Sequence, residues 1–239
     1  MNRMEVVFQR HLSFSTALRF SAFVCFALIL PFTLQAAQRS WTGLGSDALW
    51  STSANWDSGA PAATDTALFS GSGNGKTAVT LGNGATAAGL TFSQDAAAYA
   101  LGLSSETLTL SADAALTLSA GSANAQSVAA TLLVGGNLNV YNYEPSKSLT
   151  LNYTNNANRT VYIYGSGPVT FNTLRRPAGT ETTDNNYIRF ELRSPAPVTC
   201  TSALMIGQLW KDSAYLPSEL ILAPHTTNIF CRNDWEFAL

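Results

Sequence analysis

One pattern recurs between Gly89 and Gly121: it reads Gly-Leu-Thr-Phe-Ser at 89–93, Leu-Thr-Leu-Ser-Ala-Asp-Ala at 108–114 and Leu-Thr-Leu-Ser-Ala-Gly at 116–121. Each copy alternates apolar residues with small polar residues, which is the period of a β-strand with one buried face. Each copy ends in residues that suit a tight turn. The pattern therefore predicts short β-strands that stack on one another.

Imperfect copies follow along the chain, and their starts recur at intervals of roughly 8–12 residues. We expect strands near Thr77–Leu81, Gly89–Ser93, Tyr99–Leu103, Thr107–Ser111, Ala115–Ser119, Ala130–Val134, Leu138–Asn142, Ser148–Tyr153, Thr160–Gly165, Pro168–Leu174, Tyr187–Arg193, Val198–Ser202, Ala203–Gly207, Glu219–Leu222 and Asn228–Cys231. The number of expected strands exceeds that of an ordinary β-sandwich. Asn83-Gly84 is the single sequence signal for a β-hairpin. An all-β fold of the solenoid type is predicted, with a β-sandwich as the alternative.

The composition limits the partners that the chain can bind. Of its 239 residues 46% are hydrophobic and only 12% are charged, and the formal net charge is -2. The charged fraction is about half of that in typical soluble domains. Nucleic-acid binding needs an excess of basic groups, so no nucleic-acid partner is expected. Uncharged polar residues, Thr above all, suit the exposed face of a repetitive sheet.

The first 37 residues have the layout of a secretory signal peptide. Arg3, Arg10 and Arg19 precede an apolar run, 20–34, that ends close to the small residue Ala37. A membrane anchor is the alternative, but a span needs about 20 apolar residues, and this run is shorter and contains a proline. We predict a signal peptide over 1–37, cleavage near Ala37, and a mature protein that is secreted or at the cell surface. Contact with the membrane would be limited to the transient signal peptide.

An aromatic block follows the signal peptide over 38–75. Trp41, Trp50 and Trp56 are separated by Gly, Pro, Asn and Asp, which favour tight loops over a helix. A stack of strands needs its open end covered, because exposed strand edges invite aggregation. We interpret the block as a Trp-rich amino-terminal cap. The cap is favoured because buried aromatics usually serve packing. The alternative is a platform on which these tryptophans stack against sugar rings.

The spacing of this block resembles a known family. The residues that carry the resemblance are Trp41-x-Gly43, Trp50, Asn55-Trp56, Gly59, Pro61, Asp65 and Phe69, followed by Gly89-Leu90-Thr91-Phe92. They are similar to the start of autotransporter-associated β-strand repeat proteins, large secreted or surface proteins of Gram-negative-type bacteria. The resemblance implies a right-handed parallel β-helix. It also implies that the chain is an amino-terminal part of a longer protein, or a short relative that lacks the outer-membrane barrel.

The remaining chain divides into a β-solenoid over 76–209 and an irregular end segment, or truncated rung, over 210–239. The end segment contains Trp210, Pro217 and Pro224 and lacks the repeat. Two cysteines remain after the signal peptide, Cys200 and Cys231. In an oxidising compartment they would form a disulfide, and otherwise they are two buried thiols. The sequence leaves both open, because it does not place their α-carbons.

Tyrosines gather in one part of the predicted solenoid, at alternating positions around Asn-rich turns: Tyr141, Tyr143, Tyr153, Tyr162 and Tyr164. We interpret them as an aromatic ladder on the outer face of the sheet, since cross-strand aromatic pairs stabilise sheets by themselves. A ligand groove is the alternative. Further on, Arg189 and Arg193 flank Glu191 on one strand face, which predicts a solvated face with local pairing.

Signals for catalysis or nucleotide binding are weak. The stretch from Ser70 to Thr77 resembles a phosphate loop, but Ser70 stands where the motif needs Gly and a strand follows instead of a helix. His225 has no Gly-x-Ser-x-Gly partner motif and too few companions for zinc. We therefore expect no nucleotide, metal or other cofactor.

The best enzyme alternative is a polysaccharide lyase or hydrolase, which would need paired carboxylates or an Arg base in one groove. The candidate residues are few and scattered: Arg175, Arg176, Glu181, Asp184 and Glu191. The prediction is an exported, non-catalytic β-solenoid that presents an extended surface, in adhesion or as a cell-surface or matrix component. The alternative is a glycan-binding module. The expected partners are glycans or other surface and matrix components.

Overall fold

The computed structural model describes residues 36–154, 159–175, 188–193, 197–201, 219–222 and 229–231, all within one unit, Ala36–Leu239. Its strands are β1 (Gln38–Trp41), β2 (Thr66–Phe69), β3 (Ala78–Val79), β4 (Ala85–Phe92), β5 (Ala100–Leu101), β6 (Thr107–Leu118), β7 (Gln126–Val134), β8 (Leu138–Asn142), β9 (Leu149–Thr154), β10 (Arg159–Gly165), β11 (Val169–Arg175), β12 (Ile188–Leu192), β13 (Val198–Cys200), β14 (Glu219–Leu222) and β15 (Ile229–Cys231). Two short 3-10 helices accompany them, η1 (Ser53–Asn55) and η2 (Gly73–Gly75).

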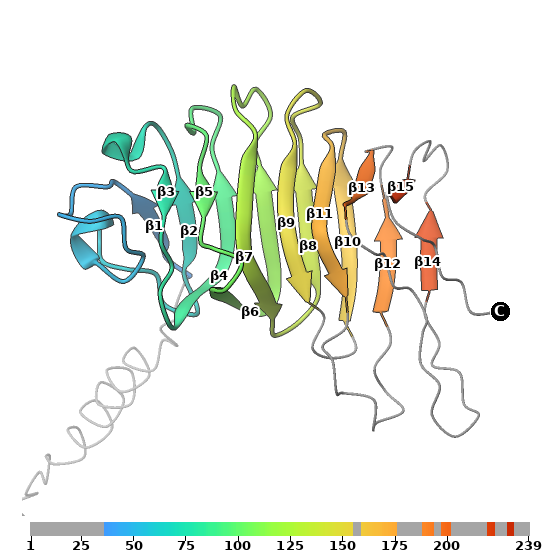
Figure 1. The fold of residues 1–239 in the computed structure, drawn as a ribbon, viewed down its shortest axis with the longest axis horizontal. Coiled ribbons are helices and arrows are strands. Elements are labelled where there is room, and N and C mark those ends of the chain that lie inside the picture. Colours follow the sequence, from blue (N-terminus) through green and yellow to red (C-terminus); the bar gives the residue numbers. More distant parts are fainter. Residues whose placement is uncertain are drawn as a thin grey trace, which may run out of the picture. The chain divides into compact units, whose positions relative to one another are not determined.

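These strands form one hydrogen-bonded sheet, and each pairing between two of them is parallel. Figure 1 shows them side by side, from β1 at one end to β14 and β15 at the other. The predicted parallel β-helix, or β-solenoid, is confirmed. The alternative of a β-sandwich is wrong, because sandwich strands pair antiparallel within two facing sheets.

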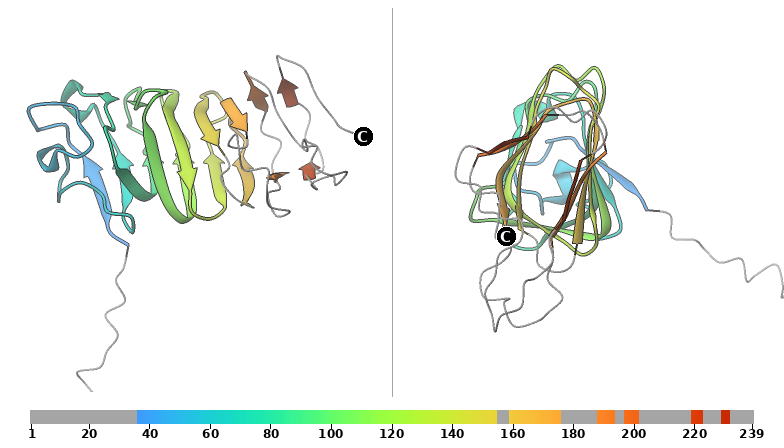
Figure 2. Two further views of the ribbon diagram at one scale, coloured as in Figure 1. Left: turned by 60° about the horizontal axis from the view of Figure 1, so that its bottom comes forward. Right: turned by 90° about the vertical axis from the view of Figure 1, so that its right-hand side faces the viewer.

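The central turns of the described solenoid run through three short faces. The first face contains β1, β2, β8, β10, β12, β14 and the second halves of β4 and β6. The second face begins at β3 and β5 and continues through the first halves of β7, β9 and β11 to β13 and β15. The remaining halves of β4, β6, β7, β9 and β11 form the third face. The right-hand view of Figure 2 looks along the stack and shows the chain winding around a common interior.

Strands bend where one face meets the next. β6 pairs with β7 over Thr107–Leu110 and with β8 over Ala114–Leu118, so a single strand turns a corner between two faces. The two strands predicted at Thr107–Ser111 and Ala115–Ser119 are therefore one. Register shifts mark similar corners in β4, β7 and β11.

The alternation of the sequence directs one set of side chains into the interior. Ala67, Leu90, Leu116, Val140 and Ile163 occupy one register position in successive turns, and each is 0% exposed. Burial of a Leu, Val or Ile side chain stabilises by about 1.5–3 kcal/mol. Because every turn adds another such layer, stacking is what supplies the core of the protein.

The solenoid sheet begins earlier than the predicted boundary at residue 76. β1 pairs with β2, and β2 pairs with β4, so both strands of the Trp-rich segment are rungs of the same sheet. Asn83-Gly84 forms a turn into a parallel strand instead of a hairpin, with Gly84 at a φ of 84°. The predicted signal peptide, except for its last residues, and the strand predicted at Ala203–Gly207 lie outside the described residues, as does most of the end segment 210–239. Among the described residues there is no helix of the length and apolarity that would span a bilayer.

Candidate functional site

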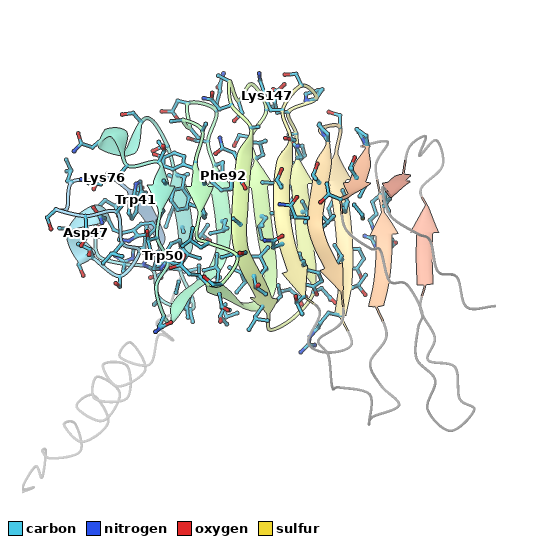
Figure 3. All side chains as sticks on the ribbon, viewed as in Figure 1. Trp41, Asp47, Trp50, Lys76, Phe92 and Lys147 are labelled. Carbon is cyan, nitrogen blue, oxygen red and sulfur yellow. The ribbon has the colours of Figure 1, made fainter. Side chains whose placement is uncertain are left out.

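The tryptophans of the amino-terminal block form a buried aromatic cluster. Trp41 and Trp50 each contact Trp56 edge to face, with ring centroids 5.1 and 4.8 Å apart, and all three rings lie within 6.2 Å of Phe69. Phe69 stacks in turn on Phe92 of the next rung at 5.4 Å. Exposure is 2% for Trp41, 2% for Trp50 and 4% for Trp56. The cluster therefore continues the core of the solenoid (Figure 3).

Each buried indole that donates a hydrogen bond does so to the backbone of the cap. The Nε1 of Trp56 donates to the carbonyl of Trp50 at 2.7 Å, and the Nε1 of Trp41 donates to the carbonyl of Lys76 at 3.0 Å. Both bonds satisfy a polar atom that would otherwise be buried at a cost. The Trp41 bond also joins β1 to the end of η2.

The loop before η1 is held by a second polar network. The Lys76 ammonium donates to the carbonyls of Gly43 and Gly45 at 2.5 and 2.7 Å. Asn55, which is 0% exposed, donates to the Asp47 carboxylate at 3.1 Å and accepts from the backbone N–H of Gly45 at 2.9 Å. The lysine that suggested a phosphate loop is thus bonded to backbone carbonyls in the cap.

The cap also covers the edge of the first strand. Trp41 and Trp56 form an antiparallel bridge, and the Asp57 N–H donates to the carbonyl of Ser40 at 2.9 Å. Stacking of a sugar needs an exposed ring face, and Trp41, Trp50 and Trp56 do not offer one. Their geometry supports the cap interpretation, so a ligand surface has to be sought elsewhere on the solenoid.

The tyrosines provide such a surface. Tyr141 in β8 and Tyr164 in β10 are opposite each other in register, and their rings stack at 4.7 Å with an interplanar angle of 12°. Tyr143 lies beside Tyr141 at 5.9 Å, and Tyr162 lies beside Tyr164 at 6.3 Å. All four are on the outside of the first face, and Tyr143 is 46% exposed. We call these four residues the tyrosine array.

The predicted tyrosine group is divided by the strand alternation. Tyr153 points into the interior with 1% exposure, while the four residues of the array point outward. The Tyr153 hydroxyl has no hydrogen-bond partner among the residues that the structure describes, and burial raises its pKa above the usual range. The outer ladder is therefore a correct interpretation for four of the five tyrosines.

Arg193 lies next to the array, directly after β12, the strand that pairs with β10. Its guanidinium lies over the ring of Tyr162, 4.4 Å from the centroid, and donates to the Tyr164 hydroxyl at 3.1 Å. Its Nε is 3.0 Å from a carboxylate oxygen of Glu191, and this hydrogen bond raises the pKa of Arg193. The predicted local pairing of Arg193 with Glu191 is present. Sequence reasoning missed the cation–π contact, because it joins residues in different turns.

The tyrosine array carries no charged group; the nearby charges are those of the Arg193–Glu191 pair. Burial raises the pKa of Tyr141, and the neighbouring Tyr164 and Tyr143 raise it further. The phenol of Tyr141 is accordingly protonated at neutral pH and can donate a hydrogen bond. The arrangement suits stacking and hydrogen bonding to an uncharged molecule better than proton transfer.

Residues proposed for the enzyme alternative are not brought together by the described structure. Glu191 is engaged by Arg193, and only the backbone of Arg175 is described, at the end of β11. Arg176, Glu181, Asp184 and His225 lie outside the described residues. Within the described ranges there is no group of three or more His, Cys, Asp or Glu residues that would hold a metal ion.

The two cysteines are at equivalent positions in neighbouring rungs. β13 and β15 pair so that Cys200 is opposite Cys231. Adjacent strands are about 4.8 Å apart, which lies within the usual range of α-carbon separations for a disulfide. Cys200 is 2% exposed. The backbone register is compatible with the predicted bridge, which stays a prediction.

Comparison of the chain with protein-family models, with curated proteins and with solved structures gives no match. The similarity to autotransporter-associated β-strand repeat proteins stays a prediction from the residues quoted above.

Proposed function

We propose that this chain is an exported, non-catalytic β-solenoid whose outer faces act as an extended contact surface, in adhesion or as part of a cell surface or matrix. An uncharged column on the first face carries the proposal. Its residues share one register position in successive rungs and are all partly exposed: Ser40, Leu68, Thr91, Thr117, Tyr141 and Tyr164. None of these six positions carries a charged side chain.

A second column on another face supports the same proposal. Ser127, Thr150, Thr170 and Thr199 are in register on the second face, and each is partly exposed. Their hydroxyls repeat at the strand spacing of about 4.8 Å. Many weak contacts to a repetitive partner add up when they are held on one rigid scaffold.

Two acidic residues in the described turns, Glu106 and Glu144, have structural partners, which also favours a non-catalytic protein. Glu106 accepts from the backbone N–H of Gly82 at 2.7 Å, and Glu144 accepts from that of Gly121 at 2.8 Å. In both cases the donor belongs to the preceding turn of the solenoid. These carboxylates hold adjacent rungs together.

Export is supported by the layout of residues 1–37 in the sequence. The test is to express the full chain in a bacterial host, to separate cytoplasm from exported fractions, and to determine the amino terminus of the product. We expect a mature protein that begins near residue 38 in the exported fraction, and beads coated with it should adhere to bacterial cells or matrix. A full-length product that stays in the cytoplasm with residues 1–37 intact would contradict the proposal.

A further inference from the structure

We propose that a neutral glycan chain binds to the outer side of the first face, stacked on the tyrosine array where the array borders β6. This inference rests on the proposed function and adds the class of ligand and its place. It moves the glycan hypothesis from the buried tryptophans to Tyr141 and Tyr143.

The stack of planar groups ends at Tyr141. The Tyr164 ring lies against one face of Tyr141, and the Arg193 guanidinium follows on the far side of Tyr164, 5.7 Å from its ring centroid. On the opposite side of Tyr141 the in-register residue is Thr117 of β6. Because Thr117 has no ring, the aromatic stack does not continue onto β6, and we place the sugar ring at this position.

Short side chains on β4 and β6 form the surface beside the Tyr141 ring. Ala115 and Thr117 of β6 and Thr91 of β4 point outward and are partly exposed. Their side chains are short, so they rise less from the sheet than a tyrosine does. Together they form a low floor, and Tyr141 and Tyr143 form the wall at its edge. The two ring centroids lie 5.9 Å apart with an interplanar angle of 23°, so the wall consists of two aromatic rings.

The chemistry of the surrounding residues suits a sugar ring. A pyranose has a C–H face that packs on an aromatic ring, and its hydroxyl groups radiate around the edge. The residues around the wall carry hydroxyl or amide groups, namely Thr91, Thr117, Asn139 and the Tyr141 phenol. Hydrogen bonding to such groups fixes orientation, while the apolar stack contributes affinity.

The charge of the surface distinguishes this ligand from other polymers. The floor carries no ionised side chain at Thr91, Ala115 or Thr117, and the formal net charge of the chain is -2. A polyanion would be weakly repelled. A cationic peptide would find no carboxylate at these floor positions, and the guanidinium of Arg193 already covers the face of Tyr162. A neutral glycan fits this combination best.

The experiment measures retardation of the exported full chain in native gels that contain hydroxyethyl cellulose, dextran or glycol chitin, with dextran sulfate as the charged comparison. At least one neutral polymer should retard the protein. Tyr141→Ala should weaken binding about tenfold, which is the size of one lost aromatic stack. Tyr141→Phe keeps the ring and should bind within about twofold of the original protein.

A second variant tests the site without removing its wall. Thr117→Arg places a long, charged side chain where the sugar is proposed to lie, and should abolish retardation even though Tyr141 is intact. Leu103→Ala is the matched surface control, because Leu103 is 62% exposed and lies between β5 and β6, outside the strands of the first face. It should bind like the original protein, and circular dichroism should show the same strand content for all variants.

The inference is overturned if no neutral polymer retards the chain, if dextran sulfate alone does, or if Thr117→Arg binds normally. These results leave the proposed function standing when the protein is still exported and adhesive. A protein that stays in the cytoplasm counts against both the proposed function and the glycan inference. The failure of the glycan inference alone can therefore be distinguished from the failure of the proposed function.

Discussion

The amino-terminal cap and the tyrosine array both concentrate aromatic residues, but they place them on opposite sides of the sheet. In the cap Trp41, Trp50 and Trp56 turn inward and are at most 4% exposed. In the array Tyr141 and Tyr143 turn outward, and their rings stack along and across the rungs. Aromatic density alone therefore does not mark a binding site. The position of each residue relative to the strand alternation decides between packing and recognition.

The largest difference between the two regions should be in stability. Trp56→Ala removes a ring that contacts Trp41, Trp50 and Phe69 and leaves a cavity at the covered end of the solenoid. We expect a loss of about 3–5 kcal/mol in the free energy of unfolding. Urea denaturation followed by circular dichroism measures it. A loss as small as that of Tyr143→Ala would mean that the indole is not part of the core.

A buried turn residue near the array should have the next largest effect. Asn142 is 0% exposed, donates to the carbonyls of Lys147 and Pro168 at 2.8 Å each, and accepts from the Glu144 N–H. Asn142→Ala leaves these groups unpaired and should cost about 1–3 kcal/mol. The control is Asn139→Ala, which is partly exposed on the same strand and should cost less in the same denaturation assay.

Acid should weaken the cap. The backbone N–H of Ala62, together with Arg39 and the N–H of Ala37, holds the pKa of Asp65 below its usual value. A carboxylate with a lowered folded pKa stabilises the protein above its unfolded pKa of about 3.9, and this contribution is lost as the pH falls through the folded pKa. Melting temperatures between pH 7 and pH 2 should therefore decline in acid.

The matched variant for this titration is Asp65→Asn. It should be less stable than the original protein at neutral pH, and the difference between the two should shrink as the pH falls below about 4. A constant difference over the whole range would show that the Asp65 charge does not contribute.

The two cysteines, Cys200 and Cys231, lie at the other end of the described solenoid, and their oxidation state can be measured. If the register of β13 and β15 leads to a bridge, non-reducing peptide mass spectrometry of the exported protein should find Cys200 joined to Cys231. Reduction should then lower the melting temperature, because a disulfide restricts the unfolded chain. Two alkylatable thiols in the unfolded, unreduced protein would rule the bridge out.

The smallest stability effect is expected on the outer surface. Tyr143→Ala loses one offset ring contact and should cost less than about 1.5 kcal/mol. Its effect on binding should exceed its effect on stability, which is the reverse of the expectation for Trp56→Ala. Parallel denaturation and gel-retardation measurements on the two variants test this reversal.

Much of the fold follows from local sequence. Alternation alone gives β8 and β14 with the observed bounds, Leu138–Asn142 and Glu219–Leu222, and in β8 the burial of the side chains follows the same period. β1 and β2 were missed, since Gly, Pro and Asn in the intervening loops obscure short strands of four residues each. The cap was expected from the density of tryptophans, but not its fusion with the first rungs.

The candidate site is only half visible in the sequence. The outward position of Tyr141 and Tyr143 follows from their spacing, whereas the stack of Tyr141 on Tyr164 depends on the length of the turn between two rungs. The same is true of Arg193, whose partners Tyr162 and Tyr164 belong to the preceding turn. Turn lengths vary, so the register between rungs is fixed by three-dimensional packing and not by any local pattern.

Hydroxyl-radical footprinting of the folded, exported protein tests the central contrast most directly, since it reads the solvent access of each ring by mass spectrometry. The account predicts rapid oxidation of Tyr143, slower oxidation of Tyr141, and protection of Trp41, Trp50, Trp56 and Tyr153. Oxidation of Trp56 at the rate of Tyr143 would contradict the stacked solenoid with its covered end, and with it the assignment of the outer tyrosines as the contact surface.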